Sequence, residues 1–373
     1  MSIDELPELL RPAIEKYRDA AEADGRLAPE LVGELRERGA FRLLTPAGIG
    51  GCEATVADAL DFYAAVARID GPTAWVLWNL NVGFGAGWLH EDAVARIWTG
   101  DRDPLIAHSG QPGLLTPADG GFRLTGRWKI VSGAHLAEWF LLAGVDPSAG
   151  PGFEGLRFCV VPRDEATVLD TWDSVGMRAS DSNAVAVEDL FVPAYMTQSL
   201  FAPPRVDVPA YRLPVVNVLL PGCAAVLIGI ARSAVDEMVT IAQAKRGLDG
   251  LPLSEKDHVT SAIGRALTQV AAARGLLLAA QRDLDDTVAA GRQTSDEQRA
   301  AVRGAIALVT ETSRTVLVSM YELGSSDPLY RANRLGRIFR DGMAAAQAAN
   351  LSTTQWTIPG RIAVGAPSGW PFI

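Results

Sequence analysis

The spacing of apolar residues changes twice along this chain of 373 residues, and this change constrains the fold more than any other feature. Residues 1–112 and 214–373 repeat apolar residues at the period of an amphipathic helix. Between them, residues 113–213 alternate with a period of two, as strands with one buried face do. Helices and strands in separate runs predict an α+β fold. We expect an N-terminal helical domain, a small central antiparallel β-barrel or sandwich, and a C-terminal four-helix bundle, with these boundaries.

The central segment contains short strand candidates bounded by Gly, Pro and Asp. The first, "GGFRLTGRWKI", alternates polar residues with four apolar residues that should share a buried face: Phe122, Leu124, Trp128 and Ile130. Three further candidates are residues 139–145, 156–162 and 183–193.

The C-terminal helices are long and have recognisable ends. One is expected to run from a cap near Ser254 to Gly291. The next opens with "TSDE", in which Thr294 and Glu297 have the spacing of a capping box. A third is expected to begin at Asp327. Apolar stripes on several long helices indicate a bundle.

Composition sets the broad class of protein. The proportions, 48 % hydrophobic and 21 % charged, are those of an ordinary soluble enzyme, and the net charge of −10 argues against a broad basic surface for nucleic acid. Three widely spaced cysteines exclude a disulfide framework and fit a reducing compartment: Cys52, Cys159 and Cys223. The acidic N-terminus lacks the basic and apolar regions of a signal peptide. We therefore expect a cytoplasmic protein.

Two apolar stretches raise the question of a membrane span. Residues 72–89 contain two asparagines, and residues 213–230 contain Asn217 and Pro221. Neither is the uninterrupted apolar run that a spanning helix needs. We expect both to be buried core or subunit contact, and we expect no membrane partner.

No standard motif for a nucleotide, a metal or a hydrolytic nucleophile is present. "GFGAGW" has two glycines of a dinucleotide fingerprint, but Trp88 stands at the third position and no strand precedes it. The four histidines are dispersed and have no Cys-x-x-Cys partners, so no metal site is predicted: His90, His108, His135 and His258.

The segment "RWKIVSGAHLAEWF" is broken at Ser132-Gly133 in the middle of an otherwise strand-like pattern. A glycine inside a strand can mark the close approach of a ligand or of another backbone. It can also mark a bulge that only bends a sheet. The residues alone leave both interpretations open.

Five stretches resemble the acyl-CoA dehydrogenase superfamily in type and order, and together they span nearly the whole chain. They are "GAFRLLTPAGIGG", "DGPTAWVLW", "GFRLTGRWKIVSGAHLAEWFLLAG", "WDSVGMRASDSNAVAVEDLFVP" and "RIFRD". The pattern of Trp128, Ser132 and Gly133 is more similar to the flavin-dependent monooxygenases of this superfamily than to its dehydrogenases. The resemblance implies that Ser132 lies beside the N5/O4 edge of a flavin and that Gly133 leaves room for the ring.

The chain departs from the family at positions that supply bases. The Glu of many dehydrogenases falls near Ala349, so α,β-dehydrogenation by that route is not expected. The two His residues of phenol-hydroxylating members fall near Ala348 and Gly83. A substrate with a nucleophilic nitrogen, a sulfur or an electron-rich ring needs less help from a base. His108 and His135 are candidate replacements, or else they cap a loop and a strand corner.

Further residues are assigned by the resemblance. Trp128, Ser109 and Ser182 join Ser132 and Gly133 as candidate flavin contacts. Arg246 either pairs with the flavin phosphate or is a surface residue at a helix end. The missing Phe-Gly pair after Arg246 favours FMN, with FAD as the alternative.

Aromatic residues are the candidates for a substrate pocket between the early apolar helix and the last helix. They are Trp78, Phe84, Trp88 and Trp356. Aromatic residues at helical spacing are also common in cores, so both interpretations stay open.

These features predict a flavin-dependent monooxygenase that takes reduced FMN from a separate reductase. It would use O2, through a flavin C4a-(hydro)peroxide, to oxygenate a small organic molecule. One alternative is an FAD-dependent acyl-CoA dehydrogenase or oxidase with a base from elsewhere. Another is a non-redox scaffold of the same fold used for binding or cyclisation. The resemblance also implies a homotetramer.

Overall fold

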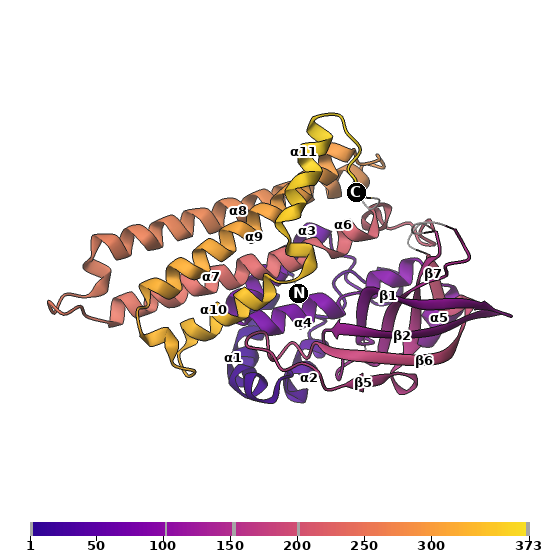
Figure 1. The fold of residues 1–373 in the computed structure, drawn as a ribbon, viewed down its shortest axis with the longest axis horizontal. Coiled ribbons are helices and arrows are strands. Elements are labelled where there is room, and N and C mark those ends of the chain that lie inside the picture. The colour runs from indigo at the N-terminus through magenta and orange to yellow at the C-terminus, as the bar shows by residue number, and fades with distance from the viewer. Residues whose placement is uncertain (1–2, 101–102, 151–153, 200–201, 371–373) are drawn as a thin grey trace.

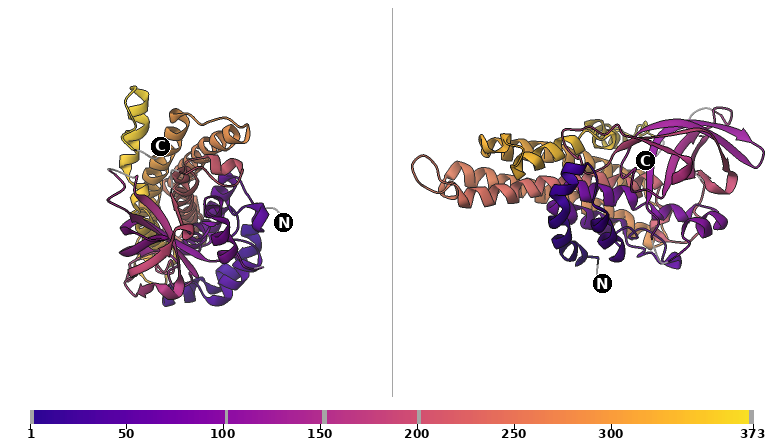
Figure 2. Two further views of the ribbon diagram at one scale, coloured as in Figure 1. Left: turned by 90° about the vertical axis from the view of Figure 1, so that its right-hand side faces the viewer. Right: turned by 90° about the horizontal axis from the view of Figure 1, so that it is seen from below.

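The computed structural model describes residues 3–100, 103–150, 154–199 and 202–370. The long C-terminal helices extend to one side and the sheet to the other, as Figure 1 shows, with the N-terminal helices beside their junction (Figure 2). The N-terminal helices are α1 (Leu6–Asp24), α2 (Pro29–Glu37), α3 (Val56–Ile69), α4 (Gly71–Leu80) and α5 (Glu91–Ile97).

The β domain is one seven-stranded sheet with the order β5-β6-β2-β1-β3-β4-β7. After the β1–β2 hairpin, the chain crosses to the other edge of β1, where β3 pairs with it in parallel. The prediction of a purely antiparallel domain is therefore wrong, and the sheet is mixed. The strands are β1 (Ile106–Ala118), β2 (Gly121–Val131), β3 (Trp139–Val145), β4 (Leu156–Pro162), β5 (Thr167–Leu169), β6 (Asn183–Pro193) and β7 (Thr197–Ser199).

Local sequence signals located three of the seven strands, since β3, β4 and β6 have the expected bounds. Two expectations fail. Strand β1 begins at Ile106, so the sheet starts before the expected boundary at 112. Ile130 is 64 % exposed and Val131 is fully buried, because a register shift between Trp128 and Val131 reverses the alternation at the end of β2.

Helix α7 is the centre of the C-terminal region. It packs against α3, α8, α9 and α10. A Cβ at Gly229 would lie 2.3 Å from the Ala64 carbonyl oxygen, so glycine allows α7 to approach α3 this closely. Within Val215–Ala244, a window of 18 residues has a mean hydropathy of 1.9, and 83 % of that window is buried inside the protein. The C-terminal helices are α6 (Val215–Leu219), α7 (Pro221–Ala244), α8 (Asp257–Ala289), α9 (Asp296–Leu323), α10 (Arg334–Ala345) and α11 (Thr357–Ala363).

The capping box at the start of α9 lies one residue later than expected. Ser295 Oγ accepts a hydrogen bond from Gln298 N, and Gln298 Oε1 accepts one from Ser295 N. The expected pair, Thr294 and Glu297, is therefore wrong, although the helix starts where such a box predicts. The expected start of a helix at Asp327 is a short 3₁₀ turn, and α10 begins seven residues later, at Arg334.

Candidate functional site

Helix α4 brings the sheet and the C-terminal helices together. Asp70 caps its first turn by accepting hydrogen bonds from the Thr73 backbone N–H and hydroxyl. Nine of the ten residues of α4 are buried, and Trp75 is the partly exposed one. A helix that is apolar on every side is expected to lie inside a protein, and α4 contacts α7, α10 and β1.

A chain of three serine hydroxyls lies against α4 at the end of β2. The Trp75 indole N–H donates to Ser132 Oγ at 3.1 Å. Ser132 Oγ lies 2.8 Å from Ser182 Oγ, which lies 2.7 Å from Ser180 Oγ. The three serines are 4 %, 2 % and 0 % exposed, so the hydroxyls depend on each other for hydrogen bonds.

The break at Ser132-Gly133 has a structural cause. Gly133 has a φ of 71°, and a Cβ there would lie 2.5 Å from Leu80 of α4. Its backbone N–H donates to the Ser180 carbonyl oxygen. Glycine is therefore needed for the left-handed backbone and for the close approach of α4. Leu80 occupies the space on the side of the missing Cβ, and the prediction that Gly133 leaves room for a flavin ring stays a prediction.

The loop that carries Ser180 and Ser182 contains two non-glycine residues in the left-handed region, Met177 (φ 54°) and Asp181 (φ 51°). Such conformations persist only where surrounding contacts hold them. The Asp181 carboxylate accepts from the His135 backbone N–H at 2.7 Å, lies 2.7 Å from His135 Nδ1, and accepts from Asn183 Nδ2 at 2.8 Å.

Both ring nitrogens of His135 lie against carboxylates. Nδ1 faces the buried Asp181, and Nε2 lies 3.2 Å from the exposed carboxylate of Asp170. This arrangement holds the ring in place and fixes Asp181. It leaves neither ring nitrogen free to act on another molecule.

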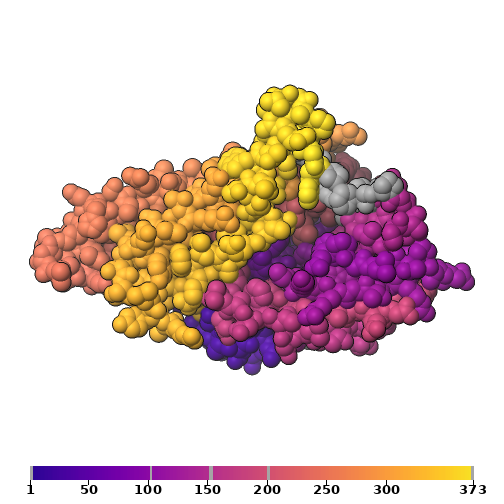
Figure 3. Space-filling view, viewed as in Figure 1, coloured from indigo at the N-terminus to yellow at the C-terminus, as the bar shows by residue number. Residues whose placement is uncertain are grey.

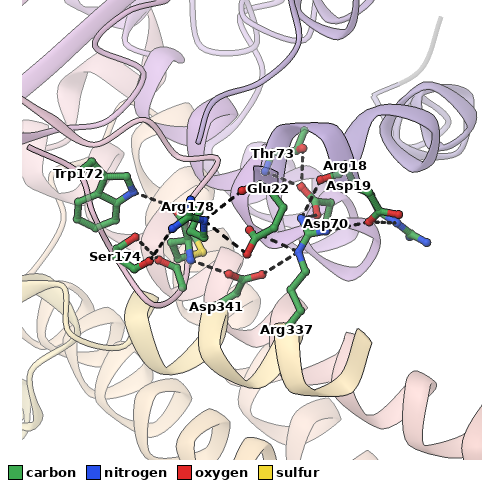
Figure 4. Close-up of polar contacts among 12 residues, drawn as sticks. Arg18, Asp19, Glu22, Asp70, Thr73, Trp172, Ser174, Arg178, Arg337 and Asp341 are labelled. Carbon is green, nitrogen blue, oxygen red and sulfur yellow. Dashed lines mark hydrogen bonds and ion pairs between the residues drawn. The ribbon is translucent and has the colours of Figure 1, made fainter. Parts of the chain in front are cut away.

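Helix α10 clamps this loop to α4. The Met177 N–H donates to Asp341 Oδ1 at 2.6 Å. One turn earlier on α10, Arg337 donates to Asp70, the cap of α4, at 3.2 Å (Figure 4). Burial raises the pKa of Asp341 to about 7, although Arg337 and the Met177 N–H act to lower it. Burial would lower the pKa of Arg337, but the surrounding carboxylates raise it.

His108 lies beside the same face of α4. Its Nδ1 is 3.0 Å from the Asn79 carbonyl oxygen, one helical turn from Trp75. A carbonyl only accepts, so Nδ1 carries the hydrogen. Burial lowers the pKa of His108 from 6.5, although the bond to Asn79 acts to raise it. The ring is therefore neutral at pH 7, with the lone pair on Nε2.

Two of the other predicted flavin contacts, Trp128 and Arg246, do not lie beside the serine hydroxyls. Trp128 has no exposed surface and donates to the Ala143 carbonyl oxygen, so it belongs to the core of the sheet. Ser109 accepts from the backbone N–H two residues later and is 8 % exposed. Arg246 donates to a carbonyl in the α7–α8 turn, at the end of the molecule opposite the sheet (Figure 1).

The predicted substrate aromatics lie in two places. Trp78 and Trp88 are 6 % exposed, and their indole N–H groups donate to the carbonyl oxygens of Leu219 and Ala202. Phe84 packs edge-on to Trp88. Trp356 is 39 % exposed and donates to a carboxylate of α9, so it lies on a different element from the other three.

Three residues of this arrangement were not assigned from the sequence. Trp75 sits in an apolar run with no signal that separates it from its neighbours. Ser180 and Asp341 lie within "GMRASDS" and "RIFRD", which carried the resemblance, so those motifs could have drawn attention to them. Asn217 is also notable: it is 1 % exposed, and neither amide atom has a hydrogen-bond partner. Its place in an apolar run was the available signal.

Open space lies near this arrangement. The surface is hollowed between the yellow C-terminal segments and the purple sheet, and darker N-terminal residues line the hollow (Figure 3). A separate cavity of about 380 Å³ lies at the start of α4, lined by charged residues such as Arg18, Asp70 and Arg334. That cavity has a mixed charged and apolar lining that includes Arg337 and Asp341, so it belongs to the contacts of α10 rather than to the serine hydroxyls. Within the described ranges, no group of His, Cys, Asp or Glu could hold a metal ion.

Comparison with known proteins gives one family. Residues 222–352 match the family model described as "Acyl-CoA dehydrogenase, C-terminal domain". A pigment production hydroxylase of Rhodococcus sp. (strain ATCC 21145) is 29 % identical over 98 % of this chain and 96 % of its own length. The flavin-dependent monooxygenase, oxygenase subunit HsaA, of Rhodococcus jostii (strain RHA1) is 28 % identical over 96 % of this chain and 97 % of its own.

Solved structures agree over the whole chain. The crystal structure of 3-HSA hydroxylase from Rhodococcus sp. RHA1 has a TM-score of 0.91 and 25 % identity, covering 98 % of both chains. XiaF from Streptomyces sp., in complex with FADH2 and glycerol, has a TM-score of 0.91 and 23 % identity, covering 100 % of this chain and 97 % of XiaF. KijD3, in complex with FMN and a dTDP-sugar, has a TM-score of 0.80 and 22 % identity, covering 98 % of this chain and 95 % of KijD3.

The match of residues 222–352 and the structural agreement over 98 % of the chain show an acyl-CoA dehydrogenase-like fold. The relatives to which the chain is similar over nearly its whole length are named as flavin-dependent monooxygenases and hydroxylases.

Proposed function

We propose that this protein is the oxygenase component of a two-component monooxygenase. It takes reduced flavin from a separate reductase and uses O2 to place one oxygen atom on a small organic molecule. The observation that carries this proposal is the serine hydroxyl chain, which ends at Ser132 on the junction of the sheet and α4. The sequence relatives named as monooxygenases support the same reaction.

The number of hydroxyl hydrogens in the serine chain leaves one donor available for a flavin. Three hydroxyls carry three hydrogens, and the two bonds between Ser132, Ser182 and Ser180 use two of them. Among the described residues, the third hydrogen has no acceptor. A flavin ring presents carbonyl oxygens and ring nitrogens along its edge, and these can accept it. The partly exposed Trp75 ring adds an apolar surface beside this donor.

The residues of the chain bind and orient, and the flavin supplies the redox chemistry. Bound reduced flavin supplies the two electrons and two protons with which O2 and the substrate give one oxygenated product, one water and oxidised flavin. Ser132 fixes the ring by a hydrogen bond from a rigid strand end. Helix α4 and the loop held by Asp341 close the pocket wall and exclude water.

His108 is the candidate proton acceptor. Its ring is neutral because burial lowers its pKa, and its Nδ1–H is tied to Asn79, so the Nε2 lone pair is available. The base of the phenol-hydroxylating relatives cannot stand at Gly83 here, because a Cβ there would lie 1.9 Å from Thr45 Oγ1. His135 holds Asp181 and is better placed as a positioning residue.

The substrate class follows from what the site lacks. Ala348 and Ala349 supply no base and His108 is only a weak one, so the substrate that we propose is already nucleophilic: an amine, a sulfur compound or an electron-rich ring. Trp78, Phe84 and Trp88 offer aromatic surface for such a molecule. Reduced FMN remains the proposed form of the flavin, and FAD is the alternative. Arg246 would contact the flavin phosphate from a second subunit of a homotetramer, and we place the protein in the cytoplasm.

Anaerobic titration with FMN and FAD, in the oxidised and reduced forms, tests this proposal. We expect the reduced form to bind, and ¹⁸O₂ to label the product when a flavin reductase supplies electrons. Ser132→Ala should weaken flavin binding about threefold to tenfold, the range for one lost hydrogen bond. Ser148→Ala, which removes a hydroxyl bonded to Asp146 in the β3–β4 turn, is the control and should leave binding unchanged. Absence of binding in every form would refute a flavoenzyme.

A further inference from the structure

Trp75 is the residue of α4 that hydrogen-bonds to the chain of serine hydroxyls. Its indole N–H donates to Ser132 Oγ across 57 residues of sequence. The ring packs edge-on to Trp78, with centroids 4.8 Å apart and planes at 77°. Trp78 is fixed in turn by its bond to the Leu219 carbonyl oxygen. The direction of the Trp75 N–H is therefore set by α4 and by the end of α6.

The bond from Trp75 limits what the Ser132 hydroxyl can do. A hydroxyl has two lone pairs and one hydrogen. Trp75 occupies one lone pair, which leaves the second for the Ser182 hydroxyl and the hydrogen for a ligand. In this arrangement the Ser180 hydroxyl donates to Ser182, Ser182 donates to Ser132, and Ser132 donates outward to the ligand.

The opposite direction leaves a buried hydrogen unpaired. If Ser132 donated to Ser182, and Ser182 to Ser180, the Ser180 hydrogen would have no acceptor among the described residues. Ser180 is fully buried, and an unpaired buried donor is costly. Outward donation is therefore the direction in which every hydroxyl hydrogen is satisfied once a ligand accepts the last one. Successive bonds in one direction also strengthen each other.

We propose that Trp75 is a positioning residue: it sets the rotamer of Ser132 and, with Ser182 and Ser180, makes that hydroxyl an outward donor. The ligand group that it serves is a hydrogen-bond acceptor on the edge of the flavin ring, such as a ring carbonyl. This inference rests on the proposed function, because it assumes that the ligand at Ser132 is a flavin. It adds a residue from α4 to a site otherwise built from the sheet.

Trp75→Phe removes the N–H and keeps most of the ring. We expect the dissociation constants of oxidised and reduced FMN to rise about threefold to tenfold, the effect of one weakened hydrogen bond. The ring carbonyls accept in both redox states, so both forms should be affected. The C=O stretch of the bound flavin should move to higher frequency in the infrared, a change that a purely structural role would not produce.

A double-mutant cycle isolates the role of Trp75. In the Ser132→Ala background, Trp75→Phe should have no further effect on flavin affinity. Trp356→Phe is the control: it also removes an indole N–H, but from a bond to a carboxylate of α9, away from the serine hydroxyls. Its effect on affinity should be the same with and without Ser132, and it should leave the C=O stretch unchanged.

The outcomes separate this inference from the proposed function. If the wild-type protein binds no flavin, the proposed function fails. If it binds flavin and Trp75→Phe changes neither affinity nor C=O frequency, only the role of Trp75 fails. An equal effect of Trp75→Phe with and without Ser132 would also overturn it, because Trp75 would then act on its own. Circular dichroism and a urea transition confirm that each variant is folded before it is titrated.

Discussion

Asp341 offers a sharp test of how α10 holds the site, because its charge and its hydrogen bond can be separated. The carboxyl is 4 % exposed, accepts from the Met177 N–H and lies 3.7 Å from Arg337 Nε. Asp341→Asn keeps an oxygen acceptor for Met177 and removes the ionisable group. The variant therefore reports what the titration of Asp341 contributes to stability.

The sign and size of the pH dependence of stability follow from the pKa of Asp341. Burial raises the pKa of Asp341 from 3.8 to about 7 in the folded protein. Between these values the folded state holds a proton that the unfolded state has lost, so this group stabilises the fold at low pH and loses that contribution as pH rises through 7. The slope is about 1.4 kcal/mol per pH unit, or about 3 kcal/mol between pH 5 and pH 7. Above pH 7 both states are ionised and the dependence ends.

Urea unfolding at half-unit intervals from pH 5 to pH 8 measures this effect. The free energy of unfolding of wild type minus that of Asp341→Asn should fall by about 3 kcal/mol from pH 5 to pH 7 and then level off. If the two profiles are parallel over this range, Asp341 is ionised throughout and Arg337 outweighs burial.

Asp285 provides the matched control. It is also buried, burial raises its pKa to about 6, and it accepts from the Ala57 N–H, where it ties α3 to α8. Asp285→Asn should remove a similar but smaller pH dependence. Asp341→Ala, which also removes the acceptor for the Met177 N–H, should weaken flavin binding, whereas Asp285→Ala should not, because of the two carboxylates only Asp341 bonds to the loop that carries Ser180 and Ser182.

Two further predictions follow from the site. Burial lowers the pKa of His108, so the rate of product formation by the wild type should fall on the acid side of its pH profile, below pH 6.5. The profile of His108→Gln should lack this acid-side fall. If the fall is unchanged in the variant, His108 is not the proton acceptor. Gly83→Ala should lower the free energy of unfolding by about 1–3 kcal/mol, because its Cβ would meet Thr45, whereas Gly33→Ala in α2, with open space around it, should not destabilise in the same urea assay.

The sequence by itself determined the features that depend on neighbouring residues. The bounds of β3, β4 and β6 follow from alternation and flanking turn residues, and the break at Ser132-Gly133 was visible as a small residue and a glycine inside a strand pattern. These signals are local, since side-chain alternation and backbone conformation are properties of a few consecutive residues. The same locality explains a failure: one bulge near the end of β2 exchanged the environments of Ile130 and Val131.

Only the tertiary structure decided which side chains meet. The bond from Trp75 to Ser132 spans 57 residues, and the bond from Met177 to Asp341 spans 164. Both depend on how α4, α10 and the sheet pack, and packing also placed Trp128 in a core and Arg246 at the far end of the molecule. Residue type gives no sign of such contacts, because an indole or a carboxylate finds its partner only when separate elements close on each other.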